Sequence, residues 1–210
     1  MAYPTVDAPY GLKPINLIGG LPFAGSTRQI PIGNNYATAI YNGDVVQLNS
    51  SGNVIITTLQ NNAAPVAGVI GVFLGCTYTN PTTKQKLFSQ YYPGNIASDD
   101  IMAYVADDPN ALFKAVNVTS NVADSAVGGL LPAYVSRAVS FGTNAELVLN
   151  TGSATTGDGK MGIFINNVTT SLPLRVVDVV TDTANSSGNF VEFVVKFNAG
   201  YHAYNNASGT

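Results

Sequence analysis

Short apolar runs separated by turn-forming residues make up most of the chain after residue 27. Runs that alternate with a period of two, or that are continuously apolar and rich in Val, Ile and aromatic residues, are typical of β-strands. No long run carries the period of about 3.6 residues expected of an amphipathic helix. We therefore predict an all-β protein. The expected strands lie at residues 28–32, 36–41, 45–48, 54–59, 66–74, 87–92, 101–105, 112–118, 134–141, 145–149, 161–165, 174–180 and 190–197.

Three of these runs carry a more specific prediction. The Asn42-Gly43 pair tolerates positive φ at both positions, so it predicts a tight hairpin between residues 36–41 and 45–48. The run 66–74 is apolar on both alternating faces, which predicts a fully buried strand, and its glycines indicate bends or close backbone approach. In the last run, Val191, Phe193, Val195 and Phe197 fall on one face, with Glu192 and Lys196 on the other.

Residues 1–27 form a different kind of segment, with prolines at positions 4, 9, 14 and 22 and several glycines between them. Proline excludes a helix and a continuous central strand, so an extended N-terminal arm is expected. The arm is too apolar for a solvated linker. We expect it to lie on another surface, either of its own domain or, as the favoured alternative, of a neighbouring chain. The predicted anchors are Tyr3, Tyr10, Leu12 and Phe23.

Residues 119–133 form the best internal boundary, because turn-forming and small residues there interrupt the strand pattern. The sequence predicts the arm (1–27) followed by two small antiparallel β-domains of barrel or sandwich type, at residues 28–120 and 121–210.

Charge is scarce: 10% of the residues are charged and the formal net charge is −3, whereas about a quarter of residues are charged in an average soluble protein. Neutral polar residues are abundant instead, with 22 Asn, 19 Thr and 14 Ser. Solubility of a free monomer usually depends on surface charge, so we expect part of this surface to contact another molecule. No cluster of Lys and Arg is present, so nucleic acid is not expected as a partner. No apolar run approaches the roughly twenty residues that span a membrane, and no secretion signal is visible, so synthesis in the cytoplasm is expected.

Catalytic chemistry finds little support. His202 is the single histidine, and no sharp strand-to-helix turn presents a serine nucleophile beside it, so we expect a packing or interface role. Cys76 is the single cysteine and follows a buried run, where a lone Cys behaves as a small apolar residue. The chain is therefore not expected to be an enzyme.

Two further patterns were considered as ligand sites. The acidic pairs Asp99-Asp100 and Asp107-Asp108 flank a predicted strand, which would hold them roughly 20 Å apart, so solvated turns are favoured over a cation site. The segment 152–157 has the glycine spacing of a phosphate loop, but Asp158 stands where the lysine is needed. We expect no metal and no cofactor.

The sequence resembles capsid cement proteins, also called head decoration proteins, of tailed phages, particularly those of marine and cyanobacterial phages. The segments that carry this resemblance are Tyr41–Val54, Pro65–Val72, Asp7–Pro14 with Gly25–Ile32, Pro173–Asp178 and Val194–Asn198, the last followed by His202 and Tyr204. Together they span most of the chain.

The resemblance implies a structural virion protein on the outer surface of the capsid. It would clamp neighbouring major capsid protein subunits against the internal DNA pressure. The resemblance also implies a homo-oligomer, with a trimer expected and a dimer as the alternative, and arms that contact the shell.

The alternative is a carbohydrate-binding or receptor-binding module on the virion surface. In that case Tyr91 with Tyr92, or Tyr201 with Tyr204, would form a stacking platform for sugars. Tyrosine pairs at strand ends more often pack across strands or at interfaces, which favours the clamp.

Overall fold

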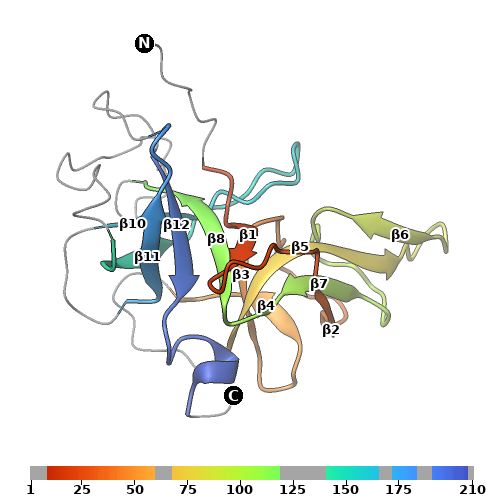
Figure 1. The fold of residues 1–210 in the computed structure, drawn as a ribbon. Helices are drawn as coiled ribbons and strands as arrows, with labels where there is room; N and C mark the ends of the chain where they lie inside the picture. The colour runs from red at the N-terminus through yellow and green to blue at the C-terminus, as the bar shows by residue number, and fades with distance from the viewer. Residues whose placement is uncertain (1–8, 60–67, 119–140, 166–171, 184–190, 208–210) are drawn as a thin grey trace.

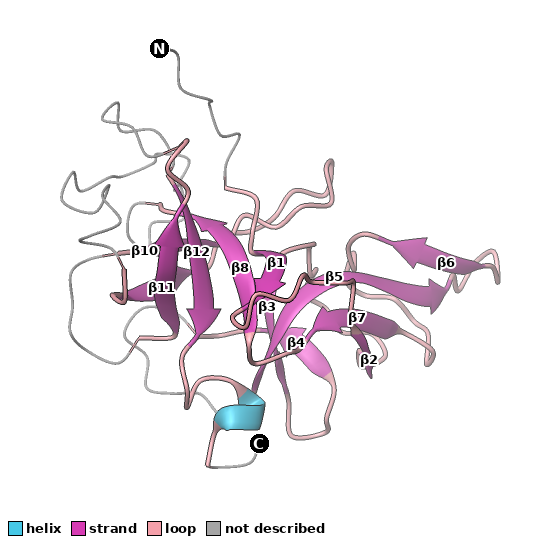
Figure 2. Cartoon of the chain, viewed as in Figure 1, coloured by secondary structure: helices cyan, strands magenta, loops and turns pink. Residues whose placement is uncertain are grey.

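The computed structural model describes residues 9–59, 68–118, 141–165, 172–183 and 191–207, and these fold into two antiparallel β-sheets (Figures 1 and 2). The prediction of an all-β protein is therefore confirmed. The helical element of this part is a short 3-10 helix, η2 (Ala203–Asn205). Within the described ranges, no helix is long and apolar enough to cross a membrane.

The first sheet, here called the barrel sheet, has six strands in the order β1-β8-β12-β11-β9-β10. Its strands are β1 (Lys13–Leu17), β8 (Ala111–Val116), β9 (Asn144–Val148), β10 (Gly162–Phe164), β11 (Leu174–Val179) and β12 (Glu192–Phe197). Beyond the end of β8, Asn117 and Ile163 form a bridge, and the Val118 amide donates to the Ile163 carbonyl at 2.8 Å. This contact returns β10 to β8, so the sheet curls into a small barrel.

The second sheet, here called the hairpin sheet, has the order β2-β7-β5-β3-β4, and β6 pairs with β5 beside this path. Its strands are β2 (Arg28–Pro31), β3 (Val45–Leu48), β4 (Val54–Ile56), β5 (Val69–Thr79), β6 (Lys86–Ser89) and β7 (Met102–Ala106). β5 is the longest strand of the chain's described part. Its second half and β6 project from the body as a hairpin (Figure 1).

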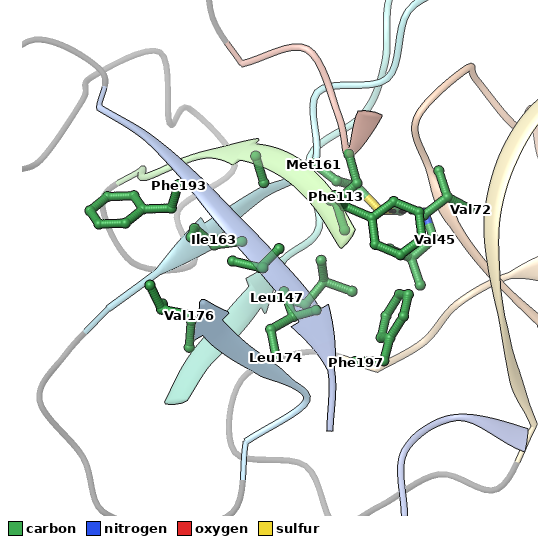
Figure 3. Close-up of a cluster of buried hydrophobic side chains, with 14 of the residues drawn as sticks. Val45, Val72, Phe113, Leu147, Met161, Ile163, Leu174, Val176, Phe193 and Phe197 are labelled. Atoms are coloured by element: carbon green, nitrogen blue, oxygen red, sulfur yellow. Dashed lines mark hydrogen bonds between the residues drawn. The ribbon is translucent and has the colours of Figure 1, made fainter. Parts of the chain in front are cut away.

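The centre of the hairpin sheet is buried on both faces. Val45 and Val72 point into a core that they share with the barrel sheet, whereas Val46 and Phe73 point into a second core within the hairpin sheet. Figure 3 shows Val45 and Val72 beside Phe113 of β8. The prediction of a strand buried on both faces is thus confirmed for the described residues 69–73. The physical reason is that each face of β3 and β5 packs against a different apolar layer.

Gly71 shows why a side chain is excluded from this strand. Its φ is +147°, and a Cβ there would lie 2.1 Å from the carbonyl oxygen of Ala106 on the neighbouring strand β7. Only glycine permits this backbone approach, as the sequence predicted.

The alternation predicted for β12 is also confirmed. Val191, Phe193, Val195 and Phe197 are all buried in the shared core. Glu192, on the other face, is buried as well, because Tyr10 of the arm covers it and donates a hydrogen bond to its carboxylate.

The predicted hairpin at Asn42-Gly43 is wrong. Residues 36–41 form no strand; Ile40 instead makes an isolated bridge to Tyr92. The side chain of Asp44 accepts a hydrogen bond from the Tyr41 amide at 2.8 Å, which closes a local turn. β3 pairs with β4 through the turn at residues 49–52 instead, where the Asn49 side chain accepts from two backbone amides.

The described part of the arm, residues 9–27, packs on its own chain. β1 pairs with β8 at the edge of the barrel sheet, with an irregularity at Pro14. The chain then turns back so that Pro22 bridges Asn16. Leu12 has no exposed surface and belongs to the shared core. Leu12 therefore lies on the alternative surface that the sequence offered, that of its own domain, and contact of the rest of the arm with a neighbouring chain stays a prediction.

The two sheets do not follow the predicted boundary at residue 120. β8 precedes that boundary, yet it lies between β1 and β12 in the barrel sheet. The hairpin sheet is built from residues 28–106, so the change from one sheet to the other falls between β7 and β8. Residues 119–140, including the predicted strand 134–141 except Phe141, lie outside the described residues.

Leu12→Ala should lower the free energy of unfolding by about 2–5 kcal/mol, because it removes a fully buried side chain and leaves a cavity. The matched control is Leu21→Ala on the same arm, where the side chain is 64% exposed and the change should be within about 0.5 kcal/mol. Urea unfolding followed by circular dichroism measures both. Equal, small effects would contradict the placement of the arm in the core.

Candidate functional site

A loop of residues 150–160, here called the junction loop, lies between β9 and β10 of the barrel sheet and contacts the hairpin-sheet half of the chain. It leaves β9 of the barrel sheet and contacts the turn that leads into β3 of the hairpin sheet. The Asn42 amide donates to the Gly157 carbonyl at 3.1 Å, and the Gly159 amide donates to the Asn42 carbonyl at 2.7 Å. These two backbone bonds fix the loop against the turn at residues 41–44.

Two glycines allow this close contact. A Cβ on Gly152 would lie 2.4 Å from the ring of Tyr41, and a Cβ on Gly159 would lie 2.3 Å from Oδ1 of Asp44. Both positions leave no room for a side chain. Gly152, one of the two glycines with phosphate-loop spacing in the sequence, thus serves packing against Tyr41.

A pocket of about 170 Å³ lies under the junction loop, between the two sheets. Its lining is mostly apolar and comes from both sides of the junction: Thr38, Ala39, Tyr41, Asp44, Ile56, Leu149, Asn150, Thr151, Gly152 and Met161. The Met161 sulfur accepts a hydrogen bond from the Val45 amide at 3.2 Å, which fixes one wall to β3. The pocket therefore exists only where the two sheets meet.

Two polar side chains of this lining are buried and incompletely hydrogen-bonded. Asp44 has no exposed surface and Asn150 is 8% exposed. Asp44 Oδ2 accepts from the Tyr41 amide, but its Oδ1 and both polar atoms of the Asn150 side chain have no partner. Burial raises the pKa of Asp44 to about 7, although the hydrogen bond from Tyr41 acts in the opposite direction.

The sequence did not single out this pair. Asp44 belongs to the segment Tyr41–Val54 that carries the resemblance, and Asn150 is one of 22 asparagines in the chain. The sequence feature that could have indicated Asp44 is its position directly before an apolar run. A carboxylate at such a position is either buried or hydrogen-bonded. Nothing in the sequence places residue 150 beside it.

His202 is buried in a packing role at the edge of the hairpin sheet. Its ring lies near Phe197 and Tyr204, and its Nδ1 accepts a hydrogen bond from the Tyr204 amide at 3.2 Å. Burial lowers its pKa, although the nearby Asp107 acts in the opposite direction. A bridge between His202 and Val69 fixes the C-terminal segment to β5.

The four acidic residues considered in the sequence have separate partners. Asp107 accepts from the Tyr204 hydroxyl at 2.7 Å and pairs with Arg28 at 2.6 Å, while Asp99 accepts from Asn34 and Asp108 accepts from the Asn110 amide. Among the described residues, no three His, Cys, Asp or Glu side chains are grouped as metal ligands.

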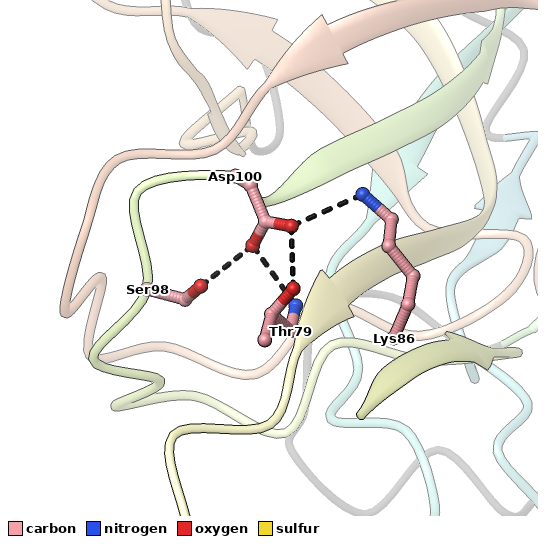
Figure 4. Close-up of polar contacts among 4 residues, drawn as sticks. All are labelled: Thr79, Lys86, Ser98 and Asp100. Carbon is pink, nitrogen blue, oxygen red and sulfur yellow. Dashed lines mark hydrogen bonds and ion pairs between the residues drawn. The ribbon is translucent and has the colours of Figure 1, made fainter. Parts of the chain in front are cut away.

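Asp100 stabilises the projecting hairpin at the end where β5 and β6 meet the connecting turn (Figure 4). Its carboxylate accepts from the amide and hydroxyl of Thr79, from the Ser98 hydroxyl and from the Lys86 ammonium, at 2.6–3.1 Å. The bond from Ser98 and those from Thr79 and Lys86 lower the pKa of Asp100. These contacts connect β5, β6 and the loop before β7, so Asp100 positions the hairpin.

Cys76 and two of the four tyrosines proposed for sugar stacking are buried. The Cys76 thiol lies in the second core near the Tyr91 carbonyl, and burial raises its pKa to about 12. Tyr92 and Tyr201 are at most 2% exposed. Neither proposed tyrosine pair therefore presents two exposed rings; Tyr91 stacks on Tyr41 at 5.5 Å between ring centroids.

The predicted arm anchors have different environments. The Tyr10 hydroxyl donates to Glu192, and the ammonium groups of Lys13 and Lys114 lie 4.9 and 5.5 Å from its ring centroid. Leu12 is fully buried, and Phe23 is partly buried against the shared core. Tyr3 lies outside the described residues. Of the anchors that the structure describes, Leu12 is not accessible to a partner.

Other apolar side chains of the described chain are exposed. Ile18 (50%) and Leu21 (64%) lie at the turn after β1, and Phe88 (78%) lies on β6 of the projecting hairpin. The sequence pattern did not identify the exposed Phe88, whereas Ile18 and Leu21 lie in the arm that was expected to contact another surface. A strand-like pattern marks residues as apolar but does not show which face remains uncovered.

Comparison of the chain with known protein families, with curated proteins and with solved structures finds no match.

Replacing Asp44 by Asn should change how stability depends on pH. The pKa of Asp44 is raised from 3.8 to about 7 in the folded protein, so the folded state holds this proton more tightly than the unfolded state. The wild type is therefore most stable relative to the variant below about pH 4. It loses that stability as the pH rises to about 7. Between pH 4 and 8 the variant should gain up to about 4 kcal/mol relative to the wild type. Urea unfolding at stepped pH measures the difference.

The titration of His202 is present in both proteins and largely cancels in this comparison. A difference in unfolding free energy that stays constant from pH 4 to 8 would contradict the raised pKa of Asp44.

Proposed function

We propose that this protein is a capsid decoration protein, which binds the outer surface of a phage head and clamps neighbouring major capsid protein subunits. In this proposal it is a structural virion component and not an enzyme. It acts as a homo-oligomer, with a trimer expected. The proposal starts from the resemblance carried by the sequence and is supported by three features of the fold.

The first support is that segments which carry the resemblance lie next to each other. Within Tyr41–Val54, β3 pairs with β4, and β3 also pairs with β5, so that Val46 lies opposite Gly71 of the segment Pro65–Val72. Likewise Pro173–Asp178 and Val194–Asn198 form the paired strands β11 and β12. Separate segments of the resemblance thus form two coherent structural units, as expected if the resemblance reflects a common fold.

The second support is the distribution of exposed apolar side chains. Phe88 is 78% exposed on the projecting hairpin, and Ile18 and Leu21 are exposed at the turn after β1. Large apolar residues presented on projecting turns are typical of surfaces that contact another protein. The exposure of Phe88 on a hairpin that Asp100 holds in place is the single observation that contributes most to the proposal.

The third support is the low charge, since a chain of which only 10% of the residues are charged suits close contact with a large partner. A clamp of this kind need not bind strongly at each contact. Anything that binds only the assembled lattice stabilises it by mass action, and the multiple subunits of an oligomer multiply that effect.

Phe88→Ser should weaken binding to expanded heads that lack the protein. Removing a large apolar contact of 1.5–3 kcal/mol corresponds to a rise of about tenfold to hundredfold in the dissociation constant. The double variant Ile18→Ser/Leu21→Ser tests the exposed turn after β1 in the same way. Co-sedimentation with heads assembled from the major capsid protein of the same phage measures binding.

The matched control is Thr83→Ala, at an exposed position near the tip of the same hairpin, which should bind as the wild type does. Failure of the wild-type protein to bind heads would overturn the proposed function. Binding of glycans by a protein that does not bind heads would favour the carbohydrate-binding alternative.

A further inference from the structure

His202 holds the segment 202–206, here called the latch, against the hairpin sheet. The backbone of His202 forms a bridge with Val69 at the start of β5, and the latch continues into the 3-10 helix η2, which is cyan in Figure 2. Tyr201, directly before the latch, is buried in the shared core. The chain is therefore anchored up to residue 201, and the latch is the part that can open beyond this anchor.

The His202 side chain acts as a hydrogen-bond acceptor in the closed latch. It caps η2, because its Nδ1 accepts from the Tyr204 amide at 3.2 Å. Such a cap satisfies a backbone donor that has no partner within the first helical turn. The imidazole is 1% exposed and lies near the rings of Phe197 and Tyr204. The contact needs an unprotonated Nδ1, since a protonated histidine has two N–H donors and no acceptor.

Protonation of this ring therefore removes the cap. The new N–H at Nδ1 would face the Tyr204 N–H, so that two donors oppose each other. The positive charge would also lie in a buried position, where an ionised group is costly. The other ring nitrogen, Nε2, is buried without a hydrogen-bond partner among the described residues. Both effects favour a state in which the ring is exposed to water.

The charged groups around the ring act in the opposite direction, but burial has the larger effect. Asp107 and Asp108, in the turn between β7 and β8, favour the protonated ring, as do backbone groups of Ile70 and Asp107. The charge of Asp107 is partly offset by Arg28 at 2.6 Å, and the same carboxylate accepts from the Tyr204 hydroxyl. Burial lowers the pKa of the imidazole in the closed latch in spite of these groups.

Tyr204 makes the second contact of the latch. Its hydroxyl donates to Asp107 at 2.7 Å, and the Arg28 guanidinium lies 5.5 Å from its ring centroid. Burial and the bond to Asp107 raise the pKa of this hydroxyl to about 12, so it stays protonated at neutral and acidic pH. Of the two latch side chains, His202 is thus the one that responds to pH near neutrality.

We propose that the latch is an acid-sensitive device, in which protonation of His202 releases residues 202–206 while both sheets stay folded. Release would uncover the start of β5 at Val69 and separate Tyr204 from Asp107. In the released state His202 has its ordinary pKa of 6.5, above its pKa in the closed latch. The closed latch therefore loses stability as the pH falls below about 6.5. The device does not depend on the proposed function, because none of these contacts involves a capsid.

Hydrogen exchange of the full chain at pH 7.5 and pH 5, corrected for intrinsic exchange rates, measures opening of the latch. The ratio of released to closed latch should rise by about five- to thirtyfold between these pH values, since the limit is tenfold per pH unit below 6.5. The projecting hairpin at residues 76–89 serves as the internal control and should change little. The chain has a single histidine, so ¹⁵N signals of the imidazole report its protonation in the same samples.

Two variants test the assigned residues. His202→Asn keeps a side-chain acceptor at the cap and removes the titration, so protection of the latch should not depend on pH. Tyr204→Phe removes the bond to Asp107 and should increase opening by a similar factor at both pH values, about two- to tenfold. Asp44 also titrates in this range, but it is present in the wild type and in both variants. Should His202→Asn fail to fold, Tyr204→Phe and the imidazole signals still test the proposal.

Four results would overturn the proposal. The first is latch opening that is the same at pH 7.5 and pH 5, and the second is opening that rises equally in the wild type and in His202→Asn. The third is an imidazole that is protonated at pH 5 while the latch stays as protected as at pH 7.5. The fourth is an equal rise in exchange of the projecting hairpin, which would show that acid unfolds the whole protein. Head binding enters none of these measurements, so their failure would leave the proposed function untouched.

Discussion

The contact between the junction loop and the turn at residues 41–44 is the constraint on which the rest of the structure depends. Two backbone hydrogen bonds and the absence of side chains at Gly152 and Gly159 bring the barrel sheet against the hairpin sheet. That approach buries one face of β3 and β5 in the shared core, while their other face lies in the second core. It also encloses Asp44 and Asn150 in one pocket, so the most unusual polar groups of the described chain result from the same contact.

The shared core explains the fate of the N-terminal arm. Leu12, directly before β1, belongs to this core, and Tyr10 hydrogen-bonds Glu192 on the outer face of β12. The buried part of the arm, around Leu12, is therefore not available to a partner. Exposed apolar residues include Ile18 and Leu21 at the turn after β1, and Phe88 on β6 of the hairpin that the network around Asp100 holds in position. If the chain clamps a capsid, these residues rather than the arm's buried face would make the contact.

Much of the fold could be predicted from local patterns. β12 has alternating apolar residues because one of its faces is buried in the shared core, and β5 is continuously apolar because both of its faces are buried. Such patterns can be identified from the sequence alone. The Asn42-Gly43 pair misled because turn propensity is local, whereas that turn is set by the Asp44 side chain and by the distant Gly157 and Gly159. The pocket could not be predicted, since residues 44 and 150 meet only through tertiary packing. The position of β8 in the barrel sheet is likewise a long-range pairing that no local pattern encodes.

The central claim is that the junction makes the two sheets one cooperative unit. Differential scanning calorimetry of the full chain, with and without Gly159→Ala, tests it most directly, because a Cβ at that position would meet the Asp44 carboxylate. The account predicts a single transition whose calorimetric and van't Hoff enthalpies agree, and a variant in which the whole transition moves to lower temperature. Two separate transitions, or a shift confined to one of them, would contradict it.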